Sequence, residues 1–206
     1  WALLMGWLNS LRVIVAGILL ATLLGVTTGA ARRSLNPLLR LLAALYVGFI
    51  RQIPLLLQLL FWYFVAFLGL PAEPFSPLGA LIHLSNQGIS LLGVTLSVEF
   101  AAVLLGLSVF TGASIAEVVR GGLDSVPRGQ WEAFRSLGMT EGLGLRRIVL
   151  PQALPAILPA LSSQYLNLAK NSTLAIAVGY VDLYSVSDTT ITQTGRAMEG
   201  FLLLLL

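Results

Sequence analysis

The sequence of 206 residues contains no cysteine, one histidine and one lysine, and only 10% of its residues are charged. The lack of cysteine excludes disulfide bonds and thiolate metal sites. A single histidine, His83, is too few for a histidine-rich metal site. In soluble domains about a quarter of the residues are charged. The shortage of charge therefore places this chain outside the usual range of soluble globular proteins.

The sequence also lacks the motifs of an enzyme. It contains no G-x-x-x-x-G-K-[ST] segment, and its lysine, Lys170, stands in a different context, so the chain has no nucleotide-binding P-loop. It shows no Ser/His/Asp set and no pair of acidic metal ligands within one apolar run. The net charge of +3 does not indicate binding to nucleic acid, because the positions of basic residues in membrane proteins follow the topology. A membrane-embedded enzyme is therefore disfavoured.

Long apolar runs fill the sequence, which is 57% hydrophobic. They predict an all-α integral membrane protein with about five transmembrane helices in one domain, residues 1–206. The predicted spans are residues 3–31, 38–70, 91–119 and 148–169, and a last span that begins near residues 191–196. Gly17, Gly25 and Gly29 in the first span allow close helix contact.

The two ends of the sequence suggest trimming. The chain begins at Trp1 and ends in five leucines. The last apolar run gives only ~15 Å of helix, about half of a ~30 Å hydrocarbon core. We therefore expect that the termini are trimmed and that the final helix is incomplete.

Basic residues gather on one side of this predicted topology. Three arginines lie between the first two spans and five lie in residues 120–147, whereas the connection 71–90 has neither lysine nor arginine. Cytoplasmic connections of membrane proteins carry the excess of basic residues. Both arginine-rich segments are therefore predicted to be cytoplasmic, and residues 71–90 and the chain's start to be external.

The second and third spans carry polar residues at depth. Arg51-Gln52-Ile53-Pro54 interrupts the second span and predicts a kinked helix that faces protein or water, with Arg51 tied to a neighbouring carboxylate or to carbonyls. Gln58 lies on the same face as Arg51 and is a candidate for lining a polar path. Glu117 pairs with Arg120 one turn away, or it serves as an intramembrane site; both interpretations stay open.

The fourth span has the largest polar face. At about 100° per residue, five polar residues share a wedge of about 120°. They are Ser163, Gln164, Asn167, Lys170 and Asn171. Polar groups facing lipid are costly, so this wedge meets protein or water. It lines a substrate passage or forms hydrogen bonds across a subunit interface.

A polar segment before the fourth span carries a recognisable motif. Glu132-Ala133 is followed six residues after Glu132 by Gly138, and nine residues separate Gly138 from Ile148, which opens Ile148-Val149-Leu150-Pro151. This pattern resembles the EAA loop of ABC importer permeases, although Phe134 departs from the second alanine. Trp131, Phe134 and Leu137 at helical spacing predict a short helix with an aromatic and apolar stripe that fits a groove, and Gly138 can end that helix.

Three further segments resemble the polar-amino-acid branch of these permeases. They are RQIPLLLQ at 51–58, AEVVRGG with SVPRGQ at 116–130, and KNSTLA at 170–175. Residues 179–195 look most like permeases of general L-amino-acid uptake systems. The resemblance covers residues 8–201.

This resemblance implies a function. The chain would be the permease subunit of an ATP-driven amino-acid importer in the bacterial inner membrane. Its partners would be a second, related permease subunit, two cytoplasmic ATPase subunits and a periplasmic amino-acid-binding protein, with the lipid bilayer around it and no nucleic acid. ATP and Mg would be bound by the ATPase, so this chain needs no cofactor or metal.

The expected sites follow from these matches. The substrate passage is predicted to be lined by Gln58, Glu117, Ser163, Gln164, Asn167, Lys170, Asn171 and Ser172. The cytoplasmic coupling loop, about residues 121–147, is predicted to contact the ATPase through Trp131, Glu132, Ala133, Phe134, Arg135 and Gly138. The alternative function is an ion-coupled secondary transporter or a channel.

Overall fold

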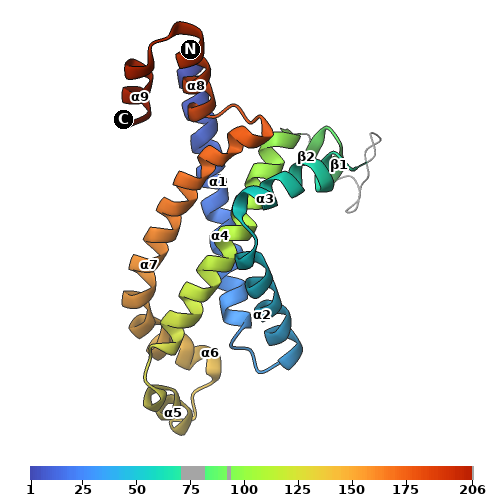
Figure 1. The fold of residues 1–206 in the computed structure, drawn as a ribbon. Coiled ribbons are helices and arrows are strands. Elements are labelled where there is room, and N and C mark those ends of the chain that lie inside the picture. Colours follow the sequence, from blue (N-terminus) through green and yellow to red (C-terminus); the bar gives the residue numbers. More distant parts are fainter. Residues whose placement is uncertain (71–81, 92–93, 206) are drawn as a thin grey trace. The chain divides into compact units, whose positions relative to one another are not determined.

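The computed structural model describes residues 1–70, 82–91 and 94–205, and its elements are drawn in Figure 1. In chain order these elements are α1 Ala2–Ala31, α2 Pro37–Gln52, α3 Leu55–Leu60, η1 Phe61–Phe67, β1 Ile82–Ser85, β2 Gly88–Leu91, β3 Val94–Ser97, α4 Val98–Asp124, α5 Arg128–Ser136, α6 Glu141–Gly144, η3 Leu145–Val149, α7 Leu150–Asn171, η4 Ser172–Val178, α8 Leu183–Thr194 and α9 Ala197–Leu205. The predicted all-α class is confirmed, with one small sheet added.

Two compact units make up the chain. Unit 1 comprises Trp1–Leu19, Ile53–Val109 and Leu168–Leu206, and unit 2 comprises Leu20–Gln52 and Phe110–Asn167. Within the described residues, α1 and α4 are long and apolar enough to cross a membrane, and a third span results if α2 and the α3–η1 segment count as one broken helix. The break falls at Ile53-Pro54, within the predicted interruption.

In unit 2, α1 packs closely against α4 because α1 presents glycines. A Cβ atom added at Gly25 would lie 2.9 Å from the carbonyl oxygen of Gly112, and one at Gly29 would lie 2.9 Å from that of Ala116. Real Cβ contacts are essentially never that short. The predicted close contact at these two glycines is therefore confirmed. The second half of α4 also buries Ala116 against Val47 of α2.

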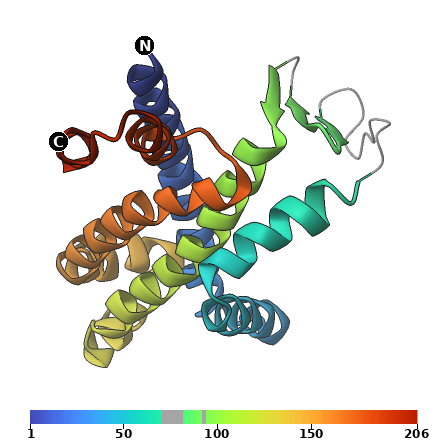
Figure 2. The same cartoon turned by 45° about the horizontal axis from the view of Figure 1, so that its top comes forward.

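In unit 1, the beginning of α4 packs on η1. Phe67, Val98, Ala101 and Ala102 are buried together. The start of α1 lies against the start of α8, as Figure 2 shows where the blue helix meets the dark red one, and a Cβ at Gly6 would touch the backbone of Asp182 and Leu183. Within unit 1, these contacts pack η1 against α4 and the start of the chain against its C-terminal part.

The region before α4 differs from the prediction. β1, β2 and β3 form an antiparallel sheet in that order, and the green strands lead into α4 in Figure 2. The predicted third span from residue 91 is therefore wrong at its start, since α4 begins at Val98. Val94-Thr95-Leu96-Ser97 alternates apolar and polar residues, which is the strand period, although the longer apolar run that it joins predicts helix. The part of the predicted external connection at residues 71–81 lies outside the described residues.

The C-terminal part also differs in detail. The predicted last span was to begin near residues 191–196, whereas Ile191 still belongs to α8 and α9 begins at Ala197. Gly195, with φ of +68°, ends α8. The side chain of Ile191 packs over Gly200. α8 and α9 therefore form a helical hairpin.

Candidate functional site

The predicted coupling loop is a folded unit built around α5. This helix begins after Pro127 and ends at Ser136. Gly138 then adopts φ of +72°; its N–H donates to the carbonyl of Arg135, and the N–H of Met139 donates to that of Phe134. These two bonds form a Schellman motif, which needs a left-handed residue at the position of Gly138. The prediction that Gly138 ends this helix is confirmed.

Phe134 is the core of this loop. Its side chain is fully buried, and a Cβ atom added at Gly144 of α6 would collide with its ring. The Trp131 ring packs beside it, with the centroids 5.9 Å apart. The expected stripe of three groove-facing residues is thus divided: Phe134 points inward, whereas Leu137 is 75% exposed. Phenylalanine fills the space over a glycine, which the helical spacing alone could not reveal.

Four of the predicted ATPase-contact residues lie on the outer surface of the loop. Glu132, Ala133, Arg135 and Gly138 are exposed. Arg135 Nε donates to Glu141 Oε1 at 2.6 Å, which ties α5 to α6. This hydrogen bond lowers the pKa of Glu141 below its ordinary value. The exposed residues therefore sit on a loop that is closed by an internal ion pair.

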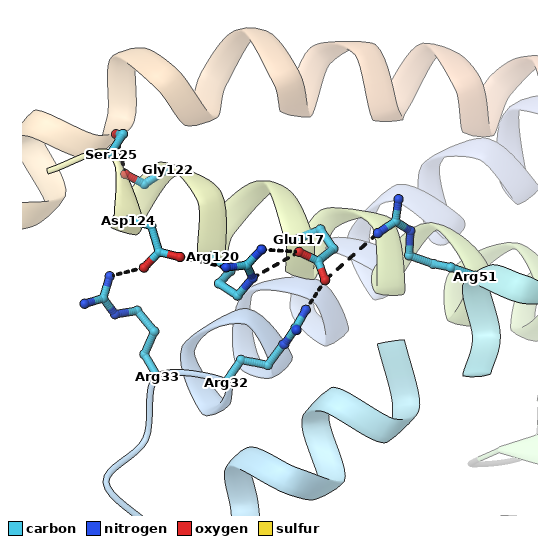
Figure 3. A network of polar contacts seen from close by, with 8 residues as sticks. All are labelled: Arg32, Arg33, Arg51, Glu117, Arg120, Gly122, Asp124 and Ser125. Atoms are coloured by element: carbon cyan, nitrogen blue, oxygen red, sulfur yellow. Dashed lines mark hydrogen bonds and ion pairs between the residues drawn. The ribbon is translucent and has the colours of Figure 1, made fainter. Parts of the chain in front are cut away.

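A network of arginines and carboxylates lies beside the loop, in unit 2 (Figure 3). Glu117 of α4 accepts from Arg32, which follows α1, and from Arg120 Nε at 3.0 Å. Arg51, at the end of α2, has its Nη1 4.0 Å from Glu117 Oε1. The predicted pair of Glu117 with Arg120 and the predicted approach of Arg51 to a carboxylate are both confirmed.

The network continues to Asp124, one turn beyond Arg120. Arg120 Nη1 lies 2.8 Å from Asp124 Oδ2, and Arg33 Nη1 lies 2.7 Å from Asp124 Oδ1. The guanidinium of Arg33 also stacks on the Trp131 ring, 4.3 Å from its centroid. Arg33 thus joins the end of α1 to α4 and to α5. Sequence reasoning treated Arg32 and Arg33 only as a basic connection, because their partners lie 85 and 91 residues away.

The polar face of α7 carries the five residues of the predicted wedge. Ser163, Asn167 and Lys170 are exposed, and Gln164 and Asn171 are half-buried. Ser163 Oγ donates to the carbonyl of Pro159 in its own helix. Within the described part of the chain, no side chain of another element forms a hydrogen bond or ion pair with these five. The polar face of α7 is therefore left open.

The remaining predicted passage residues lie elsewhere. Gln58 of α3 and Ser172 of η4 are buried in unit 1, 5% and 4% exposed. Gln58 Nε2 donates to the carbonyl of Ile53, and Ser172 Oγ donates to that of Ala169. Glu117 is engaged by arginines in unit 2. These three residues are not part of the open face.

These features define a helical membrane protein whose connecting loop is folded around its own core. Over residues 12–205 the chain matches the family described as binding-protein-dependent transport system inner membrane component, and it belongs to this family. The putative amino-acid ABC transporter permease protein YhdX of Escherichia coli (strain K12) is 34% identical, over 94% of this chain and 70% of that protein. The general L-amino acid transport system permease protein AapQ of Rhizobium johnstonii is 33% identical, over 96% of this chain and 70% of that protein.

Solved structures agree. The crystal structure of an amino acid ABC transporter with histidines superposes with a TM-score of 0.76 at 27% identity, covering 99% of this chain and 84% of that one. The inward-facing MetNI methionine ABC transporter, at 21% identity and a TM-score of 0.73, shares the fold.

Family membership assigns the broad role. The chain is a multi-pass permease subunit of an ABC import system in the bacterial inner membrane, and it works with an ATPase and a binding protein. ATP is bound and hydrolysed by the separate ATPase subunit, so the permease itself is not the enzyme and carries no cofactor. Among the described residues, no group of three or more His, Asp or Glu side chains is placed to hold a metal ion.

Proposed function

We propose that this chain imports L-amino acids through a passage lined by the polar face of α7. The proposal rests on the exposure of this polar face. Burying hydroxyl, amide and ammonium groups in lipid costs free energy unless they contact protein or water. Amides and a lysine offer both donors and acceptors to the carboxylate and ammonium of an amino acid. The relatives named for amino-acid transport support this substrate class.

A second permease subunit would complete the passage. The polar face of α7 would line one side of the passage. A partner subunit of the same fold would line the other side with its own equivalent helix. The resemblance to general L-amino-acid permeases favours a related, non-identical partner. Gln58, Glu117 and Ser172 stay predictions for the passage, since they are paired or buried in this conformation.

The passage is tested in proteoliposomes that contain the purified complex. Gln164→Leu and Asn171→Leu should each reduce ATP-driven amino-acid uptake severalfold while the complex still assembles. Ser162→Leu is the matched control, because Ser162 is an exposed polar residue of α7 outside the wedge. Normal uptake by both wedge variants would overturn this assignment.

The exposed surface of α5 would dock the ATPase. Glu132, Ala133, Arg135 and Leu137 lie outward on a loop whose core is Phe134. Two ATPase subunits, one for each permease, would draw the two loops together when they bind ATP. A switch of the passage between inward-facing and outward-facing states requires contacts that differ between the two states. The internal packing of the loop allows it to transmit such a movement as a rigid piece.

Coupling is tested by charge reversal. Glu132→Lys should uncouple ATP hydrolysis from uptake, so that hydrolysis continues and uptake falls. Asp188→Lys is the control, an exposed acidic residue on α8 in unit 1. An unchanged ratio of ATP hydrolysed to substrate imported in the Glu132 variant would contradict the docking surface.

A further inference from the structure

Unit 1 contains a cavity of about 540 Å³ that the proposed passage does not use. It is lined by the start of α1, by β3 with the start of α4, and by the segment between η4 and α8. This volume is within the ~300–1,000 Å³ range of small-molecule sites. All three segments belong to the side of the chain that the arginine distribution predicts to be external.

Two opposite charges line this cavity, Arg12 of α1 and Glu99 of α4. Among the described residues neither is joined to any oppositely charged side chain within 4.0 Å. Neither side chain forms a hydrogen bond there either. Elsewhere in the described chain, Glu117 and Asp124 are each met by two or more arginines. One cation and one anion, each without an ion-pair partner among the described residues, therefore line the same cavity.

Hydrogen bonds join two of the three segments that line the cavity. Tyr180 Oη donates to the carbonyl of Asn9 at 3.1 Å, and Asn9 Nδ2 donates to the carbonyl of Val181 at 2.9 Å. At the next residue of α1, Ser10 Oγ accepts from the N–H of Leu183 at 3.0 Å. These three bonds fix the part of α1 that carries Arg12 against the segment before α8. Preorganised walls reduce the ordering cost of binding a small ligand.

The other lining residues suit the body of such a ligand. Phe100 and Leu96 supply apolar surface, and Thr95 and Ser97 supply hydroxyl groups. Sites for small molecules combine this kind of apolar lining with a few convergent polar groups.

We propose that this cavity binds a zwitterionic amino acid, with Arg12 holding the α-carboxylate and Glu99 holding the α-ammonium. A guanidinium binds carboxylate through two parallel hydrogen bonds, and a carboxylate accepts from ammonium. The site takes its substrate class from the proposed function but is separate from the polar face of α7. It would hold the amino acid at the external end before passage.

The proposal is tested by equilibrium binding to the purified permease–ATPase complex without its binding protein. The probes are radiolabelled L-glutamine, L-glutamate and L-arginine, with N-acetyl-L-glutamine and L-glutaminamide as competitors that lack one α-charge. The complex carries Gln164→Leu and Asn171→Leu, so that the α7 face does not contribute. At least one labelled amino acid should bind.

Arg12→Gln and Glu99→Gln should each weaken that binding about tenfold to a hundredfold, the range of a charge-assisted hydrogen bond. Each variant should also change selectivity in its own way. Arg12→Gln should lose discrimination against L-glutaminamide only, and Glu99→Gln should lose discrimination against N-acetyl-L-glutamine only. Arg40→Gln, an exposed arginine in unit 2, is the matched control. Thermal unfolding of each complex shows that the variants are folded.

Several results would overturn the site. If Arg12→Gln and Glu99→Gln both bind the amino acid with unchanged affinity while uptake stays sensitive to the α7 variants, the cavity is not a binding site. The proposed function would then still hold. Unchanged amino-acid affinity with weakened binding-protein docking means that the cavity receives a protein instead. Absence of uptake of any amino acid by the wild-type complex would overturn the proposed function and this site together.

Discussion

Phe134→Ala is the sharpest perturbation of the coupling loop. The wild-type ring is fully buried and occupies the space above Gly144. Replacement of a buried phenylalanine by alanine costs about 3–5 kcal/mol, from lost burial and from the cavity left behind. Because the ring packs within the loop, we expect the loss to fall on the local stability of residues 128–149.

Hydrogen exchange of the intact complex measures this loss. A local loss of ~3 kcal/mol corresponds to about a hundredfold faster exchange, at ~1.4 kcal/mol per tenfold. The amides of Gly138 and Met139 report it directly, because their hydrogen bonds form the end of α5. Ser136→Ala is the matched control on the same helix; its side chain is exposed and is not among the proposed docking residues, and such changes stay within about 0.5 kcal/mol.

The contact with Gly144 supplies a second, independent arm. Gly144→Ala places a methyl group against the ring and should destabilise the loop by about 1–3 kcal/mol. In the Phe134→Leu background the same change should cost less, since the smaller side chain leaves room, and a double-mutant cycle measures the difference. If Phe134→Ala leaves exchange in residues 128–149 unchanged, the loop is not held by this residue and the reasoning fails.

Three further outcomes are expected in thermal unfolding of the complex. Glu117→Gln should lower stability by about 2 kcal/mol, between the values for exposed and buried ion pairs; unchanged stability with lost uptake would instead place Glu117 in the passage. Gly25→Ala should destabilise the protein by about 1–3 kcal/mol, because there is no room for its Cβ. Gly48→Ala has open space around its Cβ and should stabilise the protein by up to about 1 kcal/mol. Equal effects of the two substitutions would refute the close contact at Gly25. Asp182 caps α8 by accepting from Ser185 N–H at 2.8 Å, so Asp182→Ala should cost about 1 kcal/mol while Asp182→Asn keeps the cap, and a loss in both alike would contradict this.

Asp182 also predicts a pH dependence, because burial raises the pKa of its carboxyl above the ordinary value. The folded state therefore binds this proton more tightly than the unfolded state does. Its contribution to stability is fully present below the ordinary pKa of about 4 and is lost as the pH rises through the raised value. The Asp182→Asn variant should lack this loss. If the free energy of unfolding changes with pH in the same way in the wild type and in Asp182→Asn, this prediction is wrong.

Much of the architecture followed from local patterns in the sequence. The apolar run that gives α1 was predicted to within one residue at its start, and the end of α5 followed from Gly138, because a left-handed turn there favours glycine. The pair of Glu117 with Arg120 was also predicted, since it spans one helical turn. In each case the deciding residues are neighbours along the chain.

What escaped prediction depends on contacts between distant segments. Arg32 and Arg33 gave no local sign of their carboxylate partners on α4. The inward position of Phe134 depends on Gly144, which lies in α6, beyond the turn that follows α5. Of the three strands before α4, β3 continues into an apolar run that predicts helix, whereas β1 and most of β2 fall in the predicted external connection. The passage residues stay predictions, because the passage that we propose needs a second permease subunit to complete it.

Uptake by reconstituted vesicles tests the central claim most directly. Proteoliposomes that contain the permease–ATPase complex should accumulate a labelled amino acid only when ATP is supplied on the ATPase side and the binding protein is present on the other. Omission of either should abolish uptake, and Glu132→Lys should reduce it while ATP hydrolysis continues. Accumulation driven by an ion gradient without ATP or binding protein would contradict the account.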